Sequence, residues 1–414
     1  MAKFDVFSRN IDLAPHLQRL AVALSRRPTT ACLWLGVALR LWVYAQGRPY
    51  WMDEGSLLSN LQGVGVLDFS GPLRADQLAP PGFLAAERLL ILAFGASPYV
   101  GRLIPLACGL ASLWLFRSIA ERIATRPAAF LAMFLFAICD DLVYYSNELK
   151  PYSVDLAIGL LLTAMSLRAL HAPAVARRRL TRGLAVVAVV SPWFSFASVF
   201  VAAGCGMVLL ADRLRAGDRA EAVRWLGVGA IWAVSVLVVP QISRRLLAAA
   251  TSMYVFWDFA FLPAPPLNGR DAAKALGILL ETLVTPLNLI PTLLPYAFAV
   301  AVLAMLVQGA RRIGRRDLTT LAVLITPLVL ALAASAARRY PFHGRLILWL
   351  APALFLMIAE GAQEIRYRRG RTWYAAALAF LLYYPTVSTL YEAVPPHYRE
   401  FNRHGDLRRN RFME

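Results

Sequence analysis

Residues 30–54, TACLWLGVALRLWVYAQGRPYWMDE, join a long apolar run to two consecutive carboxylates. A helix of about 20 apolar residues crosses the hydrocarbon core of a bilayer. Carboxylates beside such a helix cost free energy unless they lie in water or have a function. The stretch therefore predicts a membrane helix that ends beside Asp53 and Glu54.

The composition places the whole chain in the membrane. Of its 414 residues, 59% are hydrophobic, and the mean hydropathy is +0.55, whereas soluble domains are about 45–50% apolar. We therefore expect an all-α polytopic membrane protein. The net charge is +18, but the arginines cluster between apolar runs, where they set topology and contact anionic lipid head groups. This pattern argues against nucleic acid as a partner.

The apolar runs predict eleven spans in one transmembrane domain, residues 29–390. The spans cover residues 29–46, 99–119, 128–146, 152–170, 183–191, 193–211, 223–242, 291–308, 318–337, 344–362 and 372–390. Ser191-Pro192 interrupts one stretch and predicts a tight hairpin of two short helices. An amphipathic segment, 1–28, is expected on the cytoplasmic surface, and a short tail, 391–414, follows the domain.

Arginine-rich loops assign the two sides of the membrane. They centre on residues 122–126, 177–182, 213–219, 311–316 and 366–371, which we place inside. Residues 47–98 and 243–290 then form the two large outer loops. Gly82–Phe94 is too short for a span and predicts a juxtamembrane helix in the first of these loops. With eleven spans, the arginine-rich tail lies outside, which conflicts with the rule that arginine-rich segments stay inside. One miscounted span would remove this conflict.

Three outer segments carry charged side chains. Asp53 and Glu54 fit either a general base or a solvated pair beside interfacial aromatics. Residues 144–155 bring Glu148, Lys150 and Tyr152 to one helix end, as a substrate site or as a terminal ion pair. The third segment holds three arginines that suit one bound phosphate or lipid head groups in general, namely Arg338, Arg339 and Arg345.

Taken together, these segments favour a transferase that acts on a lipid-linked phosphate ester. A carboxylate can take the proton of an acceptor hydroxyl, and cations can stabilise the charge that grows on a departing phosphate. The sequence contains no GxxxxGK or GxGxxG motif, which argues against a soluble nucleotide donor.

Four passages give the chain a resemblance to a known superfamily. They are Leu39-Arg40-Leu41 followed by residues 51–54, Ala79-Pro80-Pro81-Gly82-Phe83 leading to residues 94–95 and 102–105, residues 145–152, and Tyr340-Pro341-Phe342 with Arg345. In order and spacing they resemble GT-C membrane glycosyltransferases, in particular bacterial relatives of protein O-mannosyltransferases and of the lipid A aminoarabinose transferase.

The resemblance implies a GT-C-type bundle, a polyprenyl-phosphate sugar donor such as an undecaprenyl phosphate sugar, and inversion at the anomeric carbon. It implies that Asp53 is the catalytic base, that Glu54 completes an acidic pair, and that Glu148 approaches the same cavity. Relatives of the aminoarabinose enzyme often have a lysine before the double proline. Ala79 stands there, with Gln77 nearby, which shifts the expected phosphate contacts to Lys150, Arg338, Arg339 and Arg345.

We therefore predict an inverting glycosyltransferase in a bacterial inner membrane with its site facing the periplasm. The acceptor is a glycolipid or glycan of the envelope, including lipopolysaccharide, or less readily a protein hydroxyl. Further candidate substrate contacts are Tyr152, Tyr340, His343, Gln77 and Arg102. The candidate cofactor is a divalent cation, Mg²⁺ or Mn²⁺, at Asp53 and Glu54. The alternatives are a transporter or lipid flippase, and a non-catalytic assembly subunit.

Overall fold

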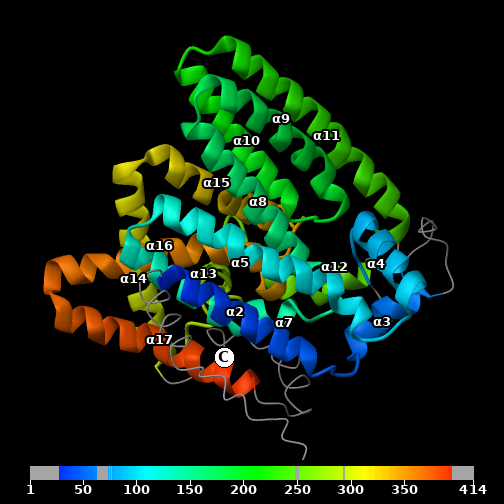
Figure 1. Cartoon of the computed structure of the whole chain (residues 1–414), viewed down its shortest axis with the longest axis horizontal. Coiled ribbons are helices and arrows are strands. Elements are labelled where there is room, and N and C mark those ends of the chain that lie inside the picture. Colours follow the sequence, from blue (N-terminus) through cyan, green and yellow to red (C-terminus); the bar gives the residue numbers. More distant parts are fainter. Residues whose placement is uncertain are drawn as a thin grey trace, which may run out of the picture.

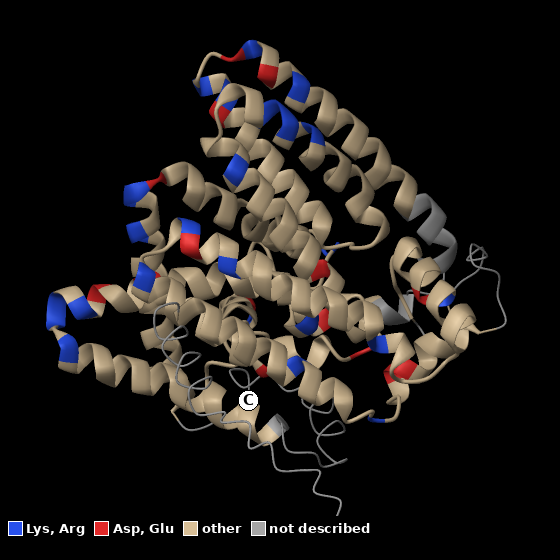
Figure 2. Cartoon of the chain, viewed as in Figure 1, with Lys and Arg blue, Asp and Glu red and all other residues tan. Residues whose placement is uncertain are grey.

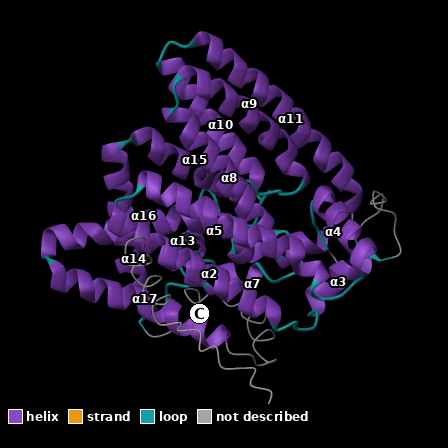
Figure 3. Cartoon of the chain, in the orientation of Figure 1, coloured by secondary structure: helices purple, strands orange, loops and turns teal. Residues whose placement is uncertain are grey.

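The computed structural model describes residues 28–62, 73, 75, 77–247, 251–291 and 294–393. It is 81% helical, and these ranges contain no strand (Figure 3). The all-α class predicted from composition is confirmed. Nearly all of the predicted N-terminal segment 1–28 and of the tail 391–414 lies outside the described residues.

The chain forms a series of helices joined by short connections. The α-helices are α2 (Pro28–Ala45), α3 (Met52–Leu61), α4 (Pro81–Phe94), α5 (Leu103–Ile123), α6 (Arg126–Ile138), α7 (Asp140–Tyr145), α8 (Tyr152–His171), α9 (Ala174–Val190), α10 (Ser198–Arg215), α11 (Arg219–Leu247), α12 (Thr251–Phe256), α13 (Gly269–Glu281), α14 (Pro295–Arg316), α15 (Leu318–Ala336), α16 (Ala351–Arg369) and α17 (Arg371–Ala393). The 3-10 helices are η1 (Val100–Arg102), η2 (Ser191–Trp193), η3 (Asp258–Ala260) and η4 (Gly344–Leu350).

Two helices occupy the centre of the bundle. α8 contacts α5, α9, α10 and η4, while α16 contacts α6, α14 and α17. The segment formed by η4 and α16 is the most deeply buried of the long apolar helices. In Figure 1, α9, α10 and α11 form one group, and α3 and α4 lie together at the side of the molecule, with α4 next to the η2 turn that joins α9 to α10. η4 therefore links the central helices to the loops near α3.

Each of the eleven predicted spans overlaps a helix, and the second, third and tenth each fall on a pair of helices. Within the described residues, six helices are long and apolar enough to cross a bilayer. They are Val100–Ile123, Tyr152–His171, Arg219–Val239, Pro295–Arg316, Leu318–Ala336 and Gly344–Arg369. The count of eleven spans thus stays a prediction. The juxtamembrane helix predicted over 82–94 is present as α4.

Two local predictions need correction. The expected tight hairpin of short helices is a pair of longer helices of 17 and 18 residues, because α9 begins at Ala174 and takes in the arginines assigned to a loop. Arginine is a good helix former, so a helix can continue past the apolar region into water. The third span is also interrupted, since Cys139 leaves the helical region with φ −60° and ψ 115°.

The basic side chains are unevenly distributed over the bundle. Figure 2 shows Lys and Arg gathered near the ends of α9 and α11, at the α14–α15 turn and at the α16–α17 turn. These ends lie away from α3 and its carboxylates. This separation is the pattern expected when one side of a membrane protein is rich in arginine and its other side holds the site.

α14 and α16 cross at two glycines. A Cβ atom built on Gly309 would lie 1.7 Å from the Met357 carbonyl oxygen, and one built on Gly361 would lie 1.8 Å from the Met305 carbonyl oxygen. Real side chains do not approach backbone so closely. The central helix α16 therefore depends on these glycines for its position, and so does η4, which precedes it.

Replacing Gly361 by valine should force the two helices apart. We expect the G361V variant to lose about 1–3 kcal/mol of stability, the usual cost of overpacking. The G229A variant is the control, because Gly229 in α11 has nothing within 4 Å of an added Cβ. It should unfold at or above the wild-type temperature, since alanine is the better helix former. Thermal unfolding in detergent measures both, and equal melting temperatures would contradict the tight crossing.

Candidate active site

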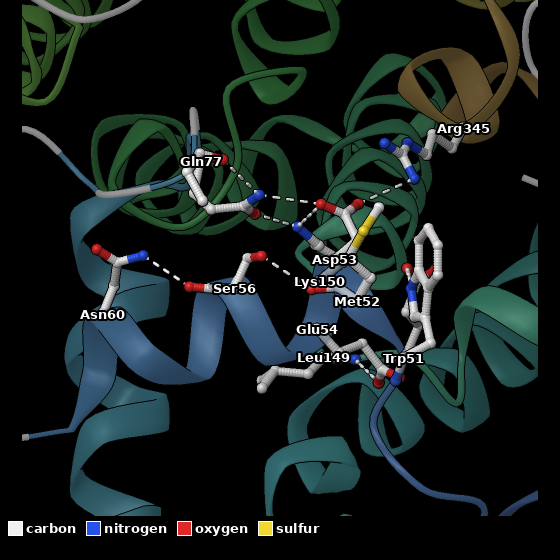
Figure 4. A network of polar contacts seen from close by, with 12 residues as sticks. Trp51, Met52, Asp53, Glu54, Ser56, Asn60, Gln77, Leu149, Lys150 and Arg345 are labelled. Carbon is white, nitrogen blue, oxygen red and sulfur yellow. Dashed lines mark hydrogen bonds and ion pairs between the residues drawn. The ribbon is translucent and has the colours of Figure 1, made fainter.

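The first turn of α3 directs two neighbouring carboxylates to different places. Consecutive residues of an α-helix point roughly 100° apart. Glu54 is fully buried, whereas the Asp53 side chain keeps 17% of its exposure. Figure 4 shows Asp53 facing Lys150, Gln77 and Arg345, while Glu54 lies below it beside Leu149. The two acids predicted as one pair therefore have different surroundings.

Glu54 is held by a buried ion pair. Arg102 donates from Nη2 to Glu54 Oε2 at 2.6 Å and from Nε to Oε1 at 2.9 Å. The backbone N–H of Leu149 adds a hydrogen bond of 2.8 Å to Oε1, and that of Trp51 adds one of 3.3 Å to Oε2. These contacts join α3 to η1 and to the segment before α8. We infer that Glu54 supports the site and does not act on substrate, in contrast to the sequence prediction.

Arg102 uses its guanidinium to hold several segments of the chain together. Besides its bonds to Glu54, its guanidinium donates to the carbonyl oxygens of Arg48, at 2.7 Å, and Pro49, at 3.1 Å. The side chain is 3% exposed. Arg102 thus fixes the chain that enters α3, and its role as a substrate contact stays a prediction.

Asp53 is the centre of a cluster built from four distant segments. Lys150 Nζ lies 3.1 Å from Asp53 Oδ1, and Arg345 Nη1 lies 3.2 Å from Oδ2. Gln77 donates from Nε2 to Oδ1 at 3.0 Å and accepts a hydrogen bond from Lys150. The sequence prediction that Asp53, Lys150 and Arg345 share a site agrees with this geometry, which we call the Asp53 cluster together with Gln77.

The neighbouring cations decide the charge of Asp53. Burial by itself raises the pKa of Asp53, but the ammonium of Lys150 and the guanidinium of Arg345 outweigh it and lower the pKa to about 2. Burial also lowers the pKa of Lys150, an effect that Asp53 opposes. Asp53 is therefore an ionised carboxylate at every physiological pH, with the low basicity that close cations impose.

Glu148 lies in the same region, but its pKa is raised where that of Asp53 is lowered. It is fully buried, and its Oε1 accepts a hydrogen bond of 3.2 Å from the indole N–H of Trp51. Among the described residues, its Oε2 has no hydrogen-bond partner. Burial, opposed mainly by Arg345, raises the pKa of Glu148 to about 7. This carboxyl group can therefore gain or lose a proton near neutral pH.

Aromatic rings line one side of the cluster. The guanidinium carbon of Arg345 lies 5.4 Å from the ring centroid of Tyr152, and Tyr152 contacts Tyr145 edge to face at 5.3 Å. Arg48 lies 4.4 Å from the Tyr144 centroid and donates to the Asn147 carbonyl oxygen at 2.7 Å. Sequence reasoning missed Arg48 and Trp51 as site residues, although both lie in the stretch that it singled out.

The remaining predicted residues lie outside the cluster. Arg338 is largely exposed and pairs with Asp258 at 2.5 Å, and Arg339 is exposed in the same turn. Tyr340 donates its hydroxyl proton to the Leu346 carbonyl oxygen. The His343 ring is buried and packs edge to face on Phe259 at 5.0 Å. Of the predicted phosphate contacts, the structure thus brings Lys150 and Arg345 to Asp53, but not Arg338 or Arg339.

Residues 257–262, part of the predicted loop 243–290, pack on the loop that leads to Arg345. The backbone N–H of Phe342 donates to the Ala260 carbonyl oxygen at 2.9 Å, and Leu262 N–H donates to Ser335 Oγ at 3.0 Å. Trp257 is buried against His343, with the ring centroids 6.2 Å apart. Residues 257–262, within the predicted loop 243–290, therefore fix the backbone just before η4.

The acidic pair does not fit a divalent cation. Asp53 already faces two cations, and both oxygens of Glu54 are bonded to Arg102. A divalent ion placed between them would meet three positive side chains at close range. In the described part of the chain, no group of three or more His, Cys, Asp or Glu side chains could hold a metal. The donor set thus disagrees with the predicted Mg²⁺ or Mn²⁺ site.

Comparison with solved structures identifies the fold of the chain. No protein-family model and no curated protein matches the sequence. Among solved structures, ArnT from Cupriavidus metallidurans, a lipid A aminoarabinose transferase, aligns over 87% of this chain and 62% of its own, with a TM-score of 0.52 and 13% identity. The chain has the GT-C fold. The resemblance stated from four sequence passages is confirmed at this level.

An archaeal oligosaccharyltransferase gives the same result. AglB from Archaeoglobus fulgidus, in complex with an inhibitory peptide and a dolichol-phosphate, aligns over 94% of this chain and 58% of its own, with a TM-score of 0.52 and 13% identity. The same oligosaccharyltransferase with Zn and sulfate aligns over 91% and 54%, with a TM-score of 0.51 and 15% identity. The chain spans 54–62% of these neighbours' lengths. Its apolar helices and this fold identify a multi-pass membrane protein.

Breaking the buried ion pair should destabilise the GT-C bundle. The E54Q variant leaves the Arg102 charge buried without its partner, which costs about 3–5 kcal/mol. The D258N variant removes one partner of the Arg338 pair, whose side chains are 59% and 55% exposed, and should cost at most about 1 kcal/mol. Thermal unfolding compares the two. A smaller loss for E54Q than for D258N would refute the structural role of Glu54.

The raised pKa of Glu148 should make stability depend on pH. Its pKa is 4.5 in the unfolded chain and about 7 in the fold, so the folded state binds more protons between these values. Stability contributed by the protonated group is therefore lost as pH rises from 4.5 to 7. The melting temperature of wild type relative to E148Q should fall over this range and level off above it. Parallel melting curves at all pH values would contradict the shift.

Proposed function

We propose that the protein is an inverting glycosyltransferase that moves a sugar from a polyprenyl-phosphate donor to an acceptor hydroxyl on the extracytoplasmic face of the membrane. The observation that carries this proposal is the Asp53 cluster, in which one partly exposed carboxylate stands between Lys150 and Arg345, whose side chains are 6% and 11% exposed. A base beside an anion-binding pair is what transfer from a phosphate ester requires. The cluster lies away from the arginine-rich turns, as the proposal demands.

The reaction proceeds in one displacement. Asp53 takes the proton of the acceptor hydroxyl as its oxygen attacks the anomeric carbon. The bond between that carbon and the phosphate oxygen breaks, and its electron pair leaves with the lipid phosphate. Lys150 and Arg345 stabilise the second negative charge on the phosphate, with Arg345 as a planar fork and Lys150 as a point charge. Attack opposite the leaving group inverts the anomeric centre.

Other side chains orient the reactants. Tyr152 presents its ring to Arg345 and limits the directions in which the guanidinium can point. Gln77 contacts both Asp53 and Lys150, so it keeps the base and the cation at a constant separation. Glu148, which Trp51 holds in place, is assigned to the acceptor, because its carboxyl group can offer either a proton or a lone pair to a sugar hydroxyl near pH 7.

The neighbours support a lipid-linked donor. AglB was solved with a dolichol-phosphate, and ArnT is a transferase that acts on lipid A. For this chain we propose undecaprenyl phosphate or a similar carrier as donor lipid, and an envelope glycolipid such as lipopolysaccharide, or another glycan, as acceptor. The setting is a bacterial inner membrane with the cluster on the periplasmic side. No metal takes part in the proposed step, since the acidic pair does not suit one.

Removing the proposed base tests this function. Envelope glycolipids of cells that lack the gene should lose one saccharide increment in their mass spectra, which wild type restores. The D53N variant should transfer about 10²–10⁴-fold more slowly, the usual effect of losing a general base, and should leave the increment missing. The D212N variant, changed in a carboxylate that pairs with Arg213 at the far end of α10, should restore it. Full restoration by well-folded D53N would refute the assignment.

A further inference from the structure

The cations of the Asp53 cluster have unused hydrogen-bonding capacity. Arg345 contacts Asp53 as an ion pair, yet within the described residues nothing accepts a hydrogen bond from its Nε or its Nη1, and both atoms are buried. Asp53 Oδ2 likewise takes part in no hydrogen bond. A buried guanidinium with unsatisfied N–H groups costs free energy. Asp53 therefore satisfies Arg345 less completely than an anion that accepts hydrogen bonds from both of these nitrogen atoms would.

A phosphate group suits these cations better than one carboxylate does. Arginine binds two oxygens of a phosphate through parallel N–H groups, and a phosphodiester has two unesterified oxygens to offer. Lys150, whose side chain is 6% exposed, can supply its charge to the same anion. Asp53 lies too close to both cations for all of its contacts to survive when a phosphate approaches them.

We propose that Asp53 and the donor phosphate compete for Lys150 and Arg345, so that donor binding releases the base. The inference rests on the proposed function and adds an order of events to it. While the cations hold Asp53, its carboxylate is poorly placed and poorly basic for an acceptor hydroxyl. A bound phosphate draws the cations away and leaves a freed carboxylate beside the anomeric carbon. The donor therefore binds before the acceptor is deprotonated.

The exchange keeps the cluster near electrical balance throughout. Two cations face one carboxylate before the donor binds; afterwards they face a singly charged phosphodiester, with the released carboxylate beside it. On transfer, the hydroxyl proton moves to Asp53 and the phosphate gains the negative charge that the carboxylate loses. When the lipid phosphate departs, Asp53 gives its proton to water and regains its two cations. No co-reactant is needed.

The decisive test is binding of a polyprenyl phosphate to the full-length protein in lipid nanodiscs. If the competition exists, the D53N variant binds the probe more tightly than wild type, by roughly threefold to a hundredfold, the range for directly coupled charges. The E148Q variant is the matched control, because Glu148 is a nearby carboxyl group that feels the charge of Arg345 but accepts its hydrogen bond from Trp51, whereas the cations are ion-paired with Asp53. It should change the affinity less than D53N does.

A double-mutant cycle separates competition from a general charge effect. K150M should weaken binding of the probe more in the D53N background than in wild type. In wild type, Lys150 must give up its ion pair with Asp53 before it can bind the phosphate, so it contributes less to the affinity there. Unchanged or weaker binding by well-folded D53N, or equal gains for D53N and E148Q, would overturn the competition while leaving the proposed donor intact. If neither wild type nor D53N binds the probe, the proposal of a polyprenyl-phosphate donor is refuted. The proposed competition is then refuted as well.

Discussion

The site depends on a guanidinium and a carboxylate that are both withdrawn from water. Arg102 and Glu54 are 3% and 0% exposed, and a buried charge is tolerable when its partner is present with good geometry. Their two hydrogen bonds hold α3 against η1, and the Leu149 N–H brings in the segment that carries Lys150. Because Asp53 precedes Glu54 on the same helical turn, fixing Glu54 inward turns Asp53 toward the cations.

The surroundings give two nearby carboxyl groups different chemistry. Asp53 faces Lys150 and Arg345, which hold it ionised, whereas burial keeps the pKa of Glu148 near neutrality. Acids whose pKa values are pushed apart in this way can serve as separate acid and base groups in one site. The division follows from geometry, because the cations contact Asp53 and the indole of Trp51 contacts Glu148.

Sequence reasoning could predict which segments meet but not which side chains face inward. Apolar runs located the helices, and outer-loop arginines in a membrane protein implied that Asp53, Lys150 and Arg345 share an anion site. A one-residue step around a helix separates Asp53 from Glu54, and only the position of Arg102 shows which of them is buried. Similarly, Arg338 and Arg345 belong to one loop, yet Arg338 pairs with Asp258 at the surface. Because both residues are arginines in the same loop, the sequence could not show which of them lies beside Asp53.

The departure from the resembled family at Ala79 has a spatial explanation. The relatives often have a lysine before the double proline, whereas Ala79 is fully buried here and cannot offer a charge. Lys150 comes from a different segment and lies at 3.1 Å from Asp53, while Gln77, two residues before Ala79, joins the two side chains. An electrostatic contribution depends on where a charge lies and not on its place in the chain. Lys150, from the segment before α8, can therefore supply the positive charge that position 79 lacks.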